Sequence, residues 1–344
     1  MRDPEVPVVF APRLAENPCM DSPFQLIRPH HDPSLVDRGL RVLVGGPEQA
    51  PGIPTSGNPD EITEKLDGFI TYAQSIHLDT RRQVLALRSC PSGEQVIAGM
   101  CLWVPAPGRT ATLFTPELTA FPQAASATQE SIIASLTDAR QADVVLVQAL
   151  MDPTDTTGNM VFSAAGLTPL ATLTYMERRP PTFLLTPPEF NLPSDLSLFP
   201  YETATHQLFR DTIIRSYEGT LDCPALSGMR DIEDVIAGHK AVGPFDPQLW
   251  GVLQRAGKPL GCLLLAEIPA RQGLELVYLG LTPEARGQGL GRLLMQRVLA
   301  IASRRHFAVA TLAVDATNVP ALRLYRRCGY SSVAQRMALV KRLI

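Results

Sequence analysis

One stretch decides how this chain is interpreted: Arg286-Gly287-Gln288-Gly289-Leu290-Gly291. It follows residues 274–281, a nearly continuous apolar run typical of a buried strand. It precedes Leu294, Val298 and Ile301, which share one face of a predicted helix. A chain that passes from strand to helix through three glycines offers free backbone N–H groups at the positive end of the helix dipole. The sequence therefore predicts a cradle for a diphosphate.

Two other interpretations of the glycine run remain open. One is a simple glycine-rich turn without a ligand. The other is a dinucleotide-binding fingerprint, with Asp315 as the carboxylate that binds the ribose. The fingerprint is weaker, because it needs its third glycine one position later, where this chain has Arg292. Its strand should also open the domain, whereas residues 259–267 already form a predicted strand ahead of the run.

The composition of the chain limits its class. A length of 344 residues exceeds what one hydrophobic core usually serves, so two domains are expected. A net charge of -3 without a long basic run argues against nucleic acid as a partner. No apolar stretch reaches the roughly 20 residues of a membrane span, and the N-terminus lacks the pattern of a secretory signal. The six cysteines are far apart, as in a reduced compartment. We therefore expect a cytoplasmic protein without a membrane partner.

The two halves of the chain end alike, which indicates an internal repeat. The segments that begin at Gly166 and Gly329 both have the order helix end, turn, strand. When the preceding strands are aligned, Asp152 falls opposite Asp315. A proline-rich segment near residues 180–193 separates the halves. The alternative is that two α/β domains share generic spacing by chance.

We predict three segments from this pattern: an N-terminal tail over residues 1–23, a first domain over 24–182 and a second over 183–344. The first copy has lost its chemistry. In place of the glycine run it has residues 119–124, whose proline and side chains would block a phosphate. In place of Tyr325 it has Phe162, which cannot donate a proton.

The second half resembles the GNAT (Gcn5-related N-acetyltransferase) superfamily. The resemblance rests on Arg286-x-x-Gly289-x-Gly291 after two strands, and on the predicted helix that runs from Asn318 through Tyr325 to Gly329. It covers residues 195–344 well and the first half as an eroded copy, and the tandem layout is similar to that of the mycothiol synthases. The resemblance implies an α/β fold with mixed sheets, in which two GNAT-like domains follow in tandem and the first is degenerate.

The resemblance also implies an activity, which is transfer of an acetyl group from acetyl-CoA to a primary amine by direct attack in a ternary complex. The amine would belong to a small molecule, a peptide or a protein. The alternative is a non-catalytic protein that binds acyl-CoA. No metal is predicted, because His30 and His31 have no third ligand at a convincing spacing.

Site residues follow from the same resemblance. Acetyl-CoA would be bound by the main chain of Leu279 and Leu281, by the loop of Arg286, Gly287, Gln288, Gly289, Leu290 and Gly291, and by Asn318. Asn318 has the alternative role of a helix cap. Three residues of the segment after residue 215 would shape the acceptor site: Tyr217, Glu218 and Asp222. This segment is equally well explained as a plain connector.

Two residues are predicted to be catalytic. Glu275 would take the proton of the amine, directly or through water, because an amine with an ordinary pKa near 10 is protonated at neutral pH. Tyr325 would protonate the leaving thiolate. An exposed strand-end carboxylate and a core aromatic are the respective alternatives, and Glu267 and Glu218 are substitutes for the base. The arginines at 304–305 and 323–327 would either meet the 3′-phosphate of the coenzyme or form solvated helix faces.

Overall fold

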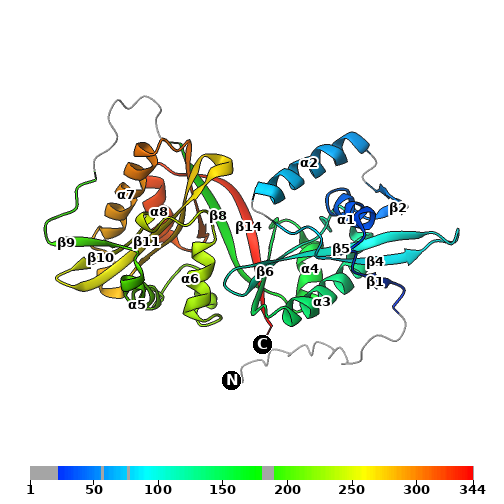
Figure 1. Cartoon of the computed structure of the whole chain (residues 1–344), viewed down its shortest axis with the longest axis horizontal. Coiled ribbons are helices and arrows are strands. Elements are labelled where there is room, and N and C mark those ends of the chain that lie inside the picture. The colour runs from blue at the N-terminus through cyan, green and yellow to red at the C-terminus, as the bar shows by residue number, and fades with distance from the viewer. Residues whose placement is uncertain (1–21, 56–57, 76–77, 180–189, 344) are drawn as a thin grey trace, which may run out of the picture.

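The computed structural model of the chain describes residues 22–55, 58–75, 78–179 and 190–343 (Figure 1). The helices are α1 (Pro33–Gly45), α2 (Pro59–Ser75), α3 (Ala125–Gln141), α4 (Thr156–Ala164), α5 (His206–Ser216), α6 (Ile232–Lys240), α7 (Leu290–Arg304) and α8 (Val319–Arg327). The strands of the first half are β1 (Gln25–Ile27), β2 (Glu48–Ala50), β3 (Ile53–Pro54), β4 (Gln83–Ser89), β5 (Gln95–Ala106), β6 (Thr110–Phe114), β7 (Leu146–Met151) and β8 (Thr168–Arg178). Those of the second half are β9 (Leu196–Pro200), β10 (Trp250–Arg255), β11 (Lys258–Ile268), β12 (Gly273–Leu281), β13 (Val309–Asp315) and β14 (Ser331–Arg342).

A single mixed sheet of 12 strands runs through both halves of the molecule. Its order is β1-β4-β5-β6-β7-β14-β8-β13-β12-β11-β10-β9. From each edge to the centre, the strands of the two halves correspond one to one, so that β6 corresponds to β12 and β7 to β13. Each half contains one parallel pair, β6 with β7 and β12 with β13. The first pairs in these ladders are Thr110 with Leu146 and Gly273 with Val309, so the two halves repeat the same spacing along the chain. The predicted repeat and mixed α/β fold are confirmed.

The last strand of each half lies in the middle of the sheet, next to the other half (Figure 1). Strand β8 pairs with β13 and β14, and β14 pairs with β7 as well as with β8. As a result, Met176 of β8 is 1% exposed within the core of the second half. The predicted boundary at residue 183 and nearly all of the predicted tail lie outside the described residues.

The helix start and stop signals predicted for the second half are present in the structure. Helix α8 begins after Asn318, whose side chain accepts a hydrogen bond from the N–H of Ala321, and Pro320 occupies its first turn. Just beyond its end, Gly329 takes a φ of 83°, which a residue without Cβ adopts easily. Strands β11 and β12 form an antiparallel hairpin, in which Cys262 pairs with Gly280 and Glu267 with Leu274.

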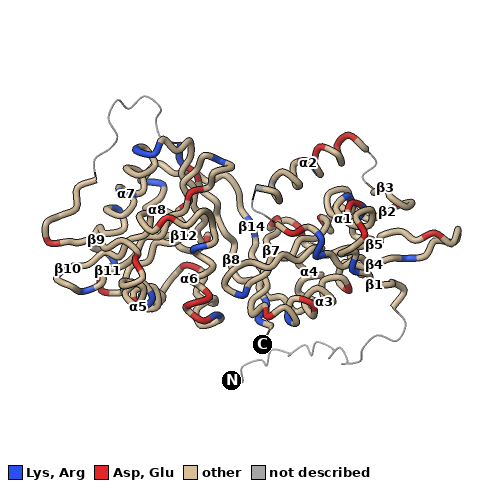
Figure 2. The backbone as a smooth tube through the Cα atoms, in the orientation of Figure 1, with Lys and Arg blue, Asp and Glu red and all other residues tan. Residues whose placement is uncertain are grey.

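Charged residues of both signs are interspersed over the two halves of the molecule (Figure 2). None of the helices in the described residues has the length and apolarity that a membrane crossing requires.

We expect Met176→Ala to destabilise the second half, although residue 176 lies on the last strand of the first. Removing a buried methionine side chain costs about 2–5 kcal/mol of the free energy of unfolding. Urea denaturation followed by the fluorescence of Trp250, which is buried in the same core, measures this loss. The control is Met160→Ala on α4, where the side chain is 65% exposed and a change within about 0.5 kcal/mol is expected. Equal effects of the two variants would contradict the shared core.

Candidate active site

The site begins where two neighbouring strands part. Strand β12 pairs with β13 only from Gly273 to Leu276, whereas it stays paired with β11 as far as Leu281. A β-bulge lies at Val277, because Leu276 and Tyr278 oppose consecutive residues of β11. Residues 277–281 therefore present one unpaired edge, and Leu279 and Leu281 both lie on it.

This edge forms one wall of a cavity of 860 Å³. The other walls come from the loop before α7, from the length of α8 and from the connection between α5 and α6. The lining residues are Ser216, Gly219, Thr220, Leu221, Asp222, Leu276, Val277, Tyr278, Leu279, Gly280, Leu281, Arg286, Gly287, Gly289, Gly291, Arg292, Ala313, Asn318, Pro320, Ala321, Arg323, Leu324, Tyr325 and Arg327. A cavity of this size and mixed lining is typical of a small-molecule site.

The glycine run directs backbone N–H groups at this cavity. Helix α7 starts at Leu290, and its N-cap Gly289 supplies no side-chain hydrogen bond. The first N–H of the helix with a backbone acceptor is that of Leu293, which donates to Gly289. Within the described residues the N–H groups of 287–292 have no acceptor. A helix start with open amides is an anion-binding feature.

The glycines are required by both conformation and space. Gly287 and Gly289 have φ values of 74° and 79°, in the left-handed region that side chains disfavour. A Cβ at either position would meet no protein atom within 4 Å, so it would project into open space at the cavity. A Cβ at Gly291 would lie 3.1 Å from the side chain of Leu324, where α7 approaches α8 closely.

The side chain of Arg286 holds the start of the α5–α6 connection in place. Its guanidinium donates to three carbonyl oxygens, those of Leu281 at 3.2 Å, Gly219 at 3.0 Å and Ser216 at 2.9 Å. Only a planar group with several donors can bridge strand end and loop in this way. Arg286 also lines the cavity, so it both shapes the site and contributes positive charge to it.

Two residues of the predicted run point their side chains elsewhere. Gln288 donates to the carbonyl of Glu284 at 2.6 Å and accepts from Arg255 at 3.1 Å. Leu290 is buried in the hydrophobic core. Both can serve a ligand only through their backbone.

Besides Arg286, three arginines line the cavity without an ion-pair partner in the described residues: Arg292 on α7, and Arg323 and Arg327 on α8. Their positive charges, together with the open amides, suit a ligand with several phosphates. Arg305 differs, because it is paired with Asp246 at 2.8 Å and with Glu267.

Tyr325 reaches the cavity from the second turn of α8, and its side chain is 8% exposed. Burial, and next the negative charge of Asp222, raise the pKa of Tyr325 well above its ordinary value. The hydroxyl therefore stays protonated at neutral pH and can donate a proton or a hydrogen bond.

Asp222 and Asp315 fasten the α5–α6 connection to the end of β13. The N–H of Asp315 donates to Asp222 at 2.9 Å, and the N–H of Cys223 donates to Asp315 at 3.2 Å. The side chain of Asn318 also hydrogen bonds to Asp222. Asn318 thus caps α8 and orients a carboxylate of the cavity wall at the same time. Reduced hydration, opposed by these hydrogen bonds, raises the pKa of Asp222.

The remaining predicted residues are not part of the cavity lining. Glu275 accepts a hydrogen bond from the hydroxyl of Thr311 at 2.5 Å, on the paired part of β12, and does not line the cavity. Glu218 is exposed and Tyr217 is half-buried, and neither belongs to the lining. Burial raises the pKa of Tyr217 to about 12.

Sequence patterns did not indicate the contributions of Ser216 and Tyr278. Their hydroxyls lie 2.7 Å apart on the cavity wall, and the ring of His239 stacks on Tyr278 at 5.7 Å between centroids. The bulge at Val277 changes which side chains share a face, and no residue type marks it.

The first half lacks the features that open the site in the second half. Its strand β6 has five residues against nine in β12, so the unpaired extension is missing. Thr119 donates through its N–H at 3.1 Å and its hydroxyl at 2.6 Å to Asp155, the N-cap of α4. A Cβ on Gly46 would lie 2.7 Å from the ring of Phe121, which packs against the core where the second half has its glycine loop.

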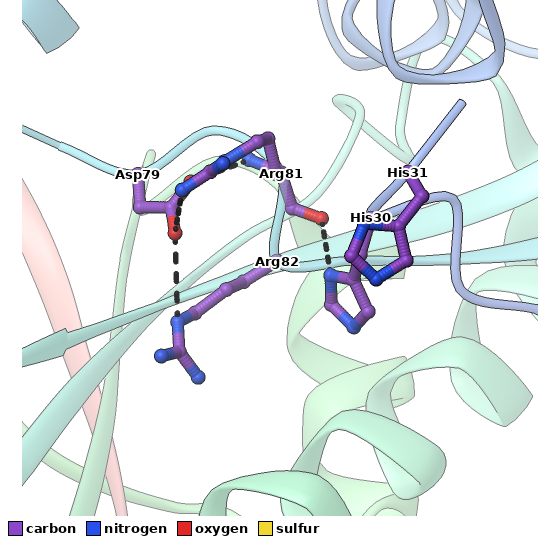
Figure 3. A pocket seen from close by; sticks show the side chains of 5 residues that line it. All are labelled: His30, His31, Asp79, Arg81 and Arg82. Carbon is purple, nitrogen blue, oxygen red and sulfur yellow. Dashed lines mark hydrogen bonds and ion pairs between the residues drawn. The ribbon is translucent and has the colours of Figure 1, made fainter. Parts of the chain in front are cut away.

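A separate shallow pocket of 310 Å³ lies in the first half (Figure 3). His30 shares a hydrogen bond with the carbonyl of Arg81 at 2.9 Å, and Asp79 pairs with Arg81 and Arg82. In the described residues no group of three or more potential ligands is arranged for a metal ion.

Comparisons with known proteins agree with this geometry. Residues 219–330 match the model of the Acetyltransferase (GNAT) family. The crystal structure of a GCN5-related N-acetyltransferase from Sphaerobacter thermophilus matches 94% of this chain and 97% of its own, with a TM-score of 0.53 at 16% identity. The second half is therefore similar to the GNAT family over residues 219–330, and the chain as a whole has the GNAT fold in two tandem copies.

Two related proteins have names that state a particular activity. The chain is 35% identical over 105 residues to a mycothiol acetyltransferase of Streptomyces bingchenggensis, and 34% identical over 104 residues to that of Streptomyces avermitilis. Each alignment covers 30% of this chain and 32% of the relative. The similarity therefore spans about a third of these relatives.

We expect Arg286→Ala to loosen the start of the α5–α6 connection, the loop that its guanidinium contacts. Loss of the hydrogen bonds to the loop should lower the free energy of its local opening by about 1 kcal/mol, which is about fivefold in rate. The N–H of Thr220, which donates to Tyr217, reports this as faster hydrogen exchange. Arg304→Ala removes an exposed guanidinium at the far end of α7 and should leave that exchange unchanged. Unchanged exchange in Arg286→Ala would show that the guanidinium does not hold the loop.

Proposed function

We propose that the protein transfers an acetyl group from acetyl-CoA to a primary amine by direct attack within a ternary complex. One observation carries the proposal. The open amides of residues 287–292 and the unpaired edge of β12 border the same cavity. Acetyl-CoA contains a diphosphate and a chain with amide groups. The diphosphate needs the open amides and the chain needs the unpaired strand edge, side by side.

The coenzyme fits the residues of this cavity. The amides of 287–292 bind the diphosphate, and the left-handed glycines keep side chains away from it. Main-chain groups of Leu279 and Leu281 bind the pantetheine amides. Arg292, Arg323 and Arg327 are placed for the phosphates, because no acidic residue in the described part of the chain neutralises them. Asn318 contributes from the start of α8.

Tyr325 is the proton donor in this proposal. Attack on a thioester carbonyl ends with a thiolate leaving, which is easier when a neighbouring hydroxyl protonates the sulfur. The raised pKa of Tyr325 keeps that proton available.

The acceptor enters from the α5–α6 side, where Asp222 lines the cavity. Tyr217 and Glu218 belong to the same connection but not to the cavity lining. Two carboxylates are available to take the proton of the amine. Glu275 lies on β12 beside Thr311 and would act through water. Asp222 lies on the cavity wall itself.

We expect Gly289→Glu to abolish acetyl-CoA binding. The new side chain extends into the cavity, and its negative charge repels the diphosphate. Calorimetry should show binding weakened at least 100-fold and coenzyme A release lost. The matched control is Gly257→Glu, at a turn with a φ of 77° and no atom within 4 Å of a Cβ, where the backbone penalty is the same and binding should be unchanged. Equal binding by the two variants would remove the basis of the proposal.

We expect Tyr325→Phe to lower kcat about 100-fold without weakening acetyl-CoA binding, because only the proton donor is lost. Coenzyme A release, measured with a thiol reagent across a panel of amines, gives kcat, and calorimetry gives the affinity. Tyr330→Phe is the control, since the hydroxyl of Tyr330 is buried without a hydrogen-bond partner in the described residues. Should wild-type protein bind acetyl-CoA but release no coenzyme A with any amine, a binding protein would replace the proposed enzyme.

A further inference from the structure

We propose that Asp222 binds the ammonium group of the acceptor and takes its proton, so that the acceptor is a cationic primary amine. This inference rests on the proposed acetyltransferase function. It assigns the role of base to a residue of the α5–α6 connection in place of Glu275.

Asp222 is held in a fixed orientation at the cavity wall. The N–H of Asp315 donates to one of its oxygens at 2.9 Å, and Asn318 hydrogen bonds to the same carboxylate. The next residue, Cys223, has a φ of 44° and donates its N–H to Asp315. A backbone in this left-handed conformation costs free energy for a residue with a side chain, so the surrounding contacts determine it. Asp222 also lines the cavity, so a ligand bound there can reach its carboxylate.

Two carboxylates meet at this point without a cation. Asp315 is 3% exposed and accepts from the N–H groups of Cys223 and Thr317 and from the Thr317 hydroxyl. Within the described residues neither Asp222 nor Asp315 forms an ion pair with Lys or Arg. Neighbouring like charges without a counter-ion favour a bound cation. An ammonium group on the cavity side of Asp222 supplies it.

The charges along α8 separate the two substrates. Asp222 contacts Asn318, at the start of the helix. Arg323 and Arg327 lie further along, about 8 and 14 Å down the axis at 1.5 Å per residue. The anionic coenzyme and a cationic amine therefore have different preferred ends of one cavity, and Tyr325 lies between those ends of the helix.

Glu275 is less suited to the same task. Its carboxylate accepts from the Thr311 hydroxyl, where β12 is still paired with β13, and it does not line the cavity. Asp222, in contrast, lines the cavity together with Tyr325. The proton acceptor and the proton donor thus face one space.

The protons balance in this arrangement. The ammonium gives one proton to the Asp222 carboxylate, which later releases it to water. The free amine nitrogen attacks the carbonyl carbon of the acyl thioester, forming the C–N bond, and the C–S bond breaks. The sulfur takes the proton of the Tyr325 hydroxyl. The second proton lost by nitrogen restores that hydroxyl. The products are the amide, the thiol and one proton in solution.

The dependence on pH follows from the charge of Asp222. Only the carboxylate form accepts a proton, so kcat/KM should rise with pH as Asp222 ionises. Because its pKa is raised, this acidic limb lies above the ordinary value near 4. The titratable groups that face Asp222 are Asp315, Cys223, Tyr217, Tyr278 and Tyr325. Among them only Asp315 is acidic, and it shifts the limb in the same direction.

The test compares Asp222→Asn with Glu275→Gln in the full-length protein, with tyramine, spermidine and lysine methyl ester as acceptor probes. We expect Asp222→Asn to lose at least 100-fold in kcat/KM for the amines and to lose the acidic limb, while calorimetry shows acetyl-CoA binding within twofold of wild type. Glu275→Gln should keep the limb. Asp211→Asn, which removes an exposed charge from α5, controls for net charge and should match wild type.

A second pair separates chemistry from folding. Asp222→Glu and Asp222→Gln have side chains of the same length, and only Glu titrates. An acidic limb in the pH profile of kcat/KM that returns in Asp222→Glu but not in Asp222→Gln supports the inference. Equal pH profiles of the two variants overturn it. An acidic limb that persists in Asp222→Asn, or one that disappears in Glu275→Gln, also overturns it. Coenzyme A release by wild-type protein tests the proposed function separately, because it depends on neither variant.

Discussion

The parting of β12 from β13 after Leu276 is the constraint on which the site depends. A paired β12 would have used its backbone groups within the sheet, and no cavity would exist between its edge and α8. The bulge at Val277 shifts the side-chain alternation at this point, so that Tyr278 meets Ser216 while the backbone beyond it stays open. The glycine loop then places the start of α7 beside that open edge. Strand, loop and helix act together because each leaves polar backbone groups that only a ligand or water can satisfy.

Much of this arrangement could be predicted from local sequence. The glycine run, the cap at Asn318 and Gly329 act through backbone conformation within a few residues, and such signals are readable in one chain. The match of Phe162 with Tyr325 is equally local, because both positions follow a helix cap at the same interval. The residues predicted for the coenzyme and for catalysis remain predictions, but the cavity brings most of them together.

The remainder depends on contacts between distant segments, which local patterns do not encode. Arg286 looks in sequence like part of a phosphate loop, yet its guanidinium holds carbonyls some 70 residues earlier in the chain. Glu275 has the right residue type near the site, but its direction is set by its neighbour Thr311 on β13. The mutual bonds of Asp222 and Asp315 likewise follow from tertiary structure.

The exchange of β8 and β14 explains how one half could lose its site while the chain kept its fold. The loss at Thr119 and Phe121 affects one end of the first half, whereas β8 still supplies Met176 to the partner half. The same crossing of final strands would join two separate chains of a half-length ancestor into a dimer. In such an ancestor every change at the glycine loop would alter both copies at once. Within one polypeptide the two copies can change independently, so one half can serve as scaffold alone while the other keeps the open glycine loop.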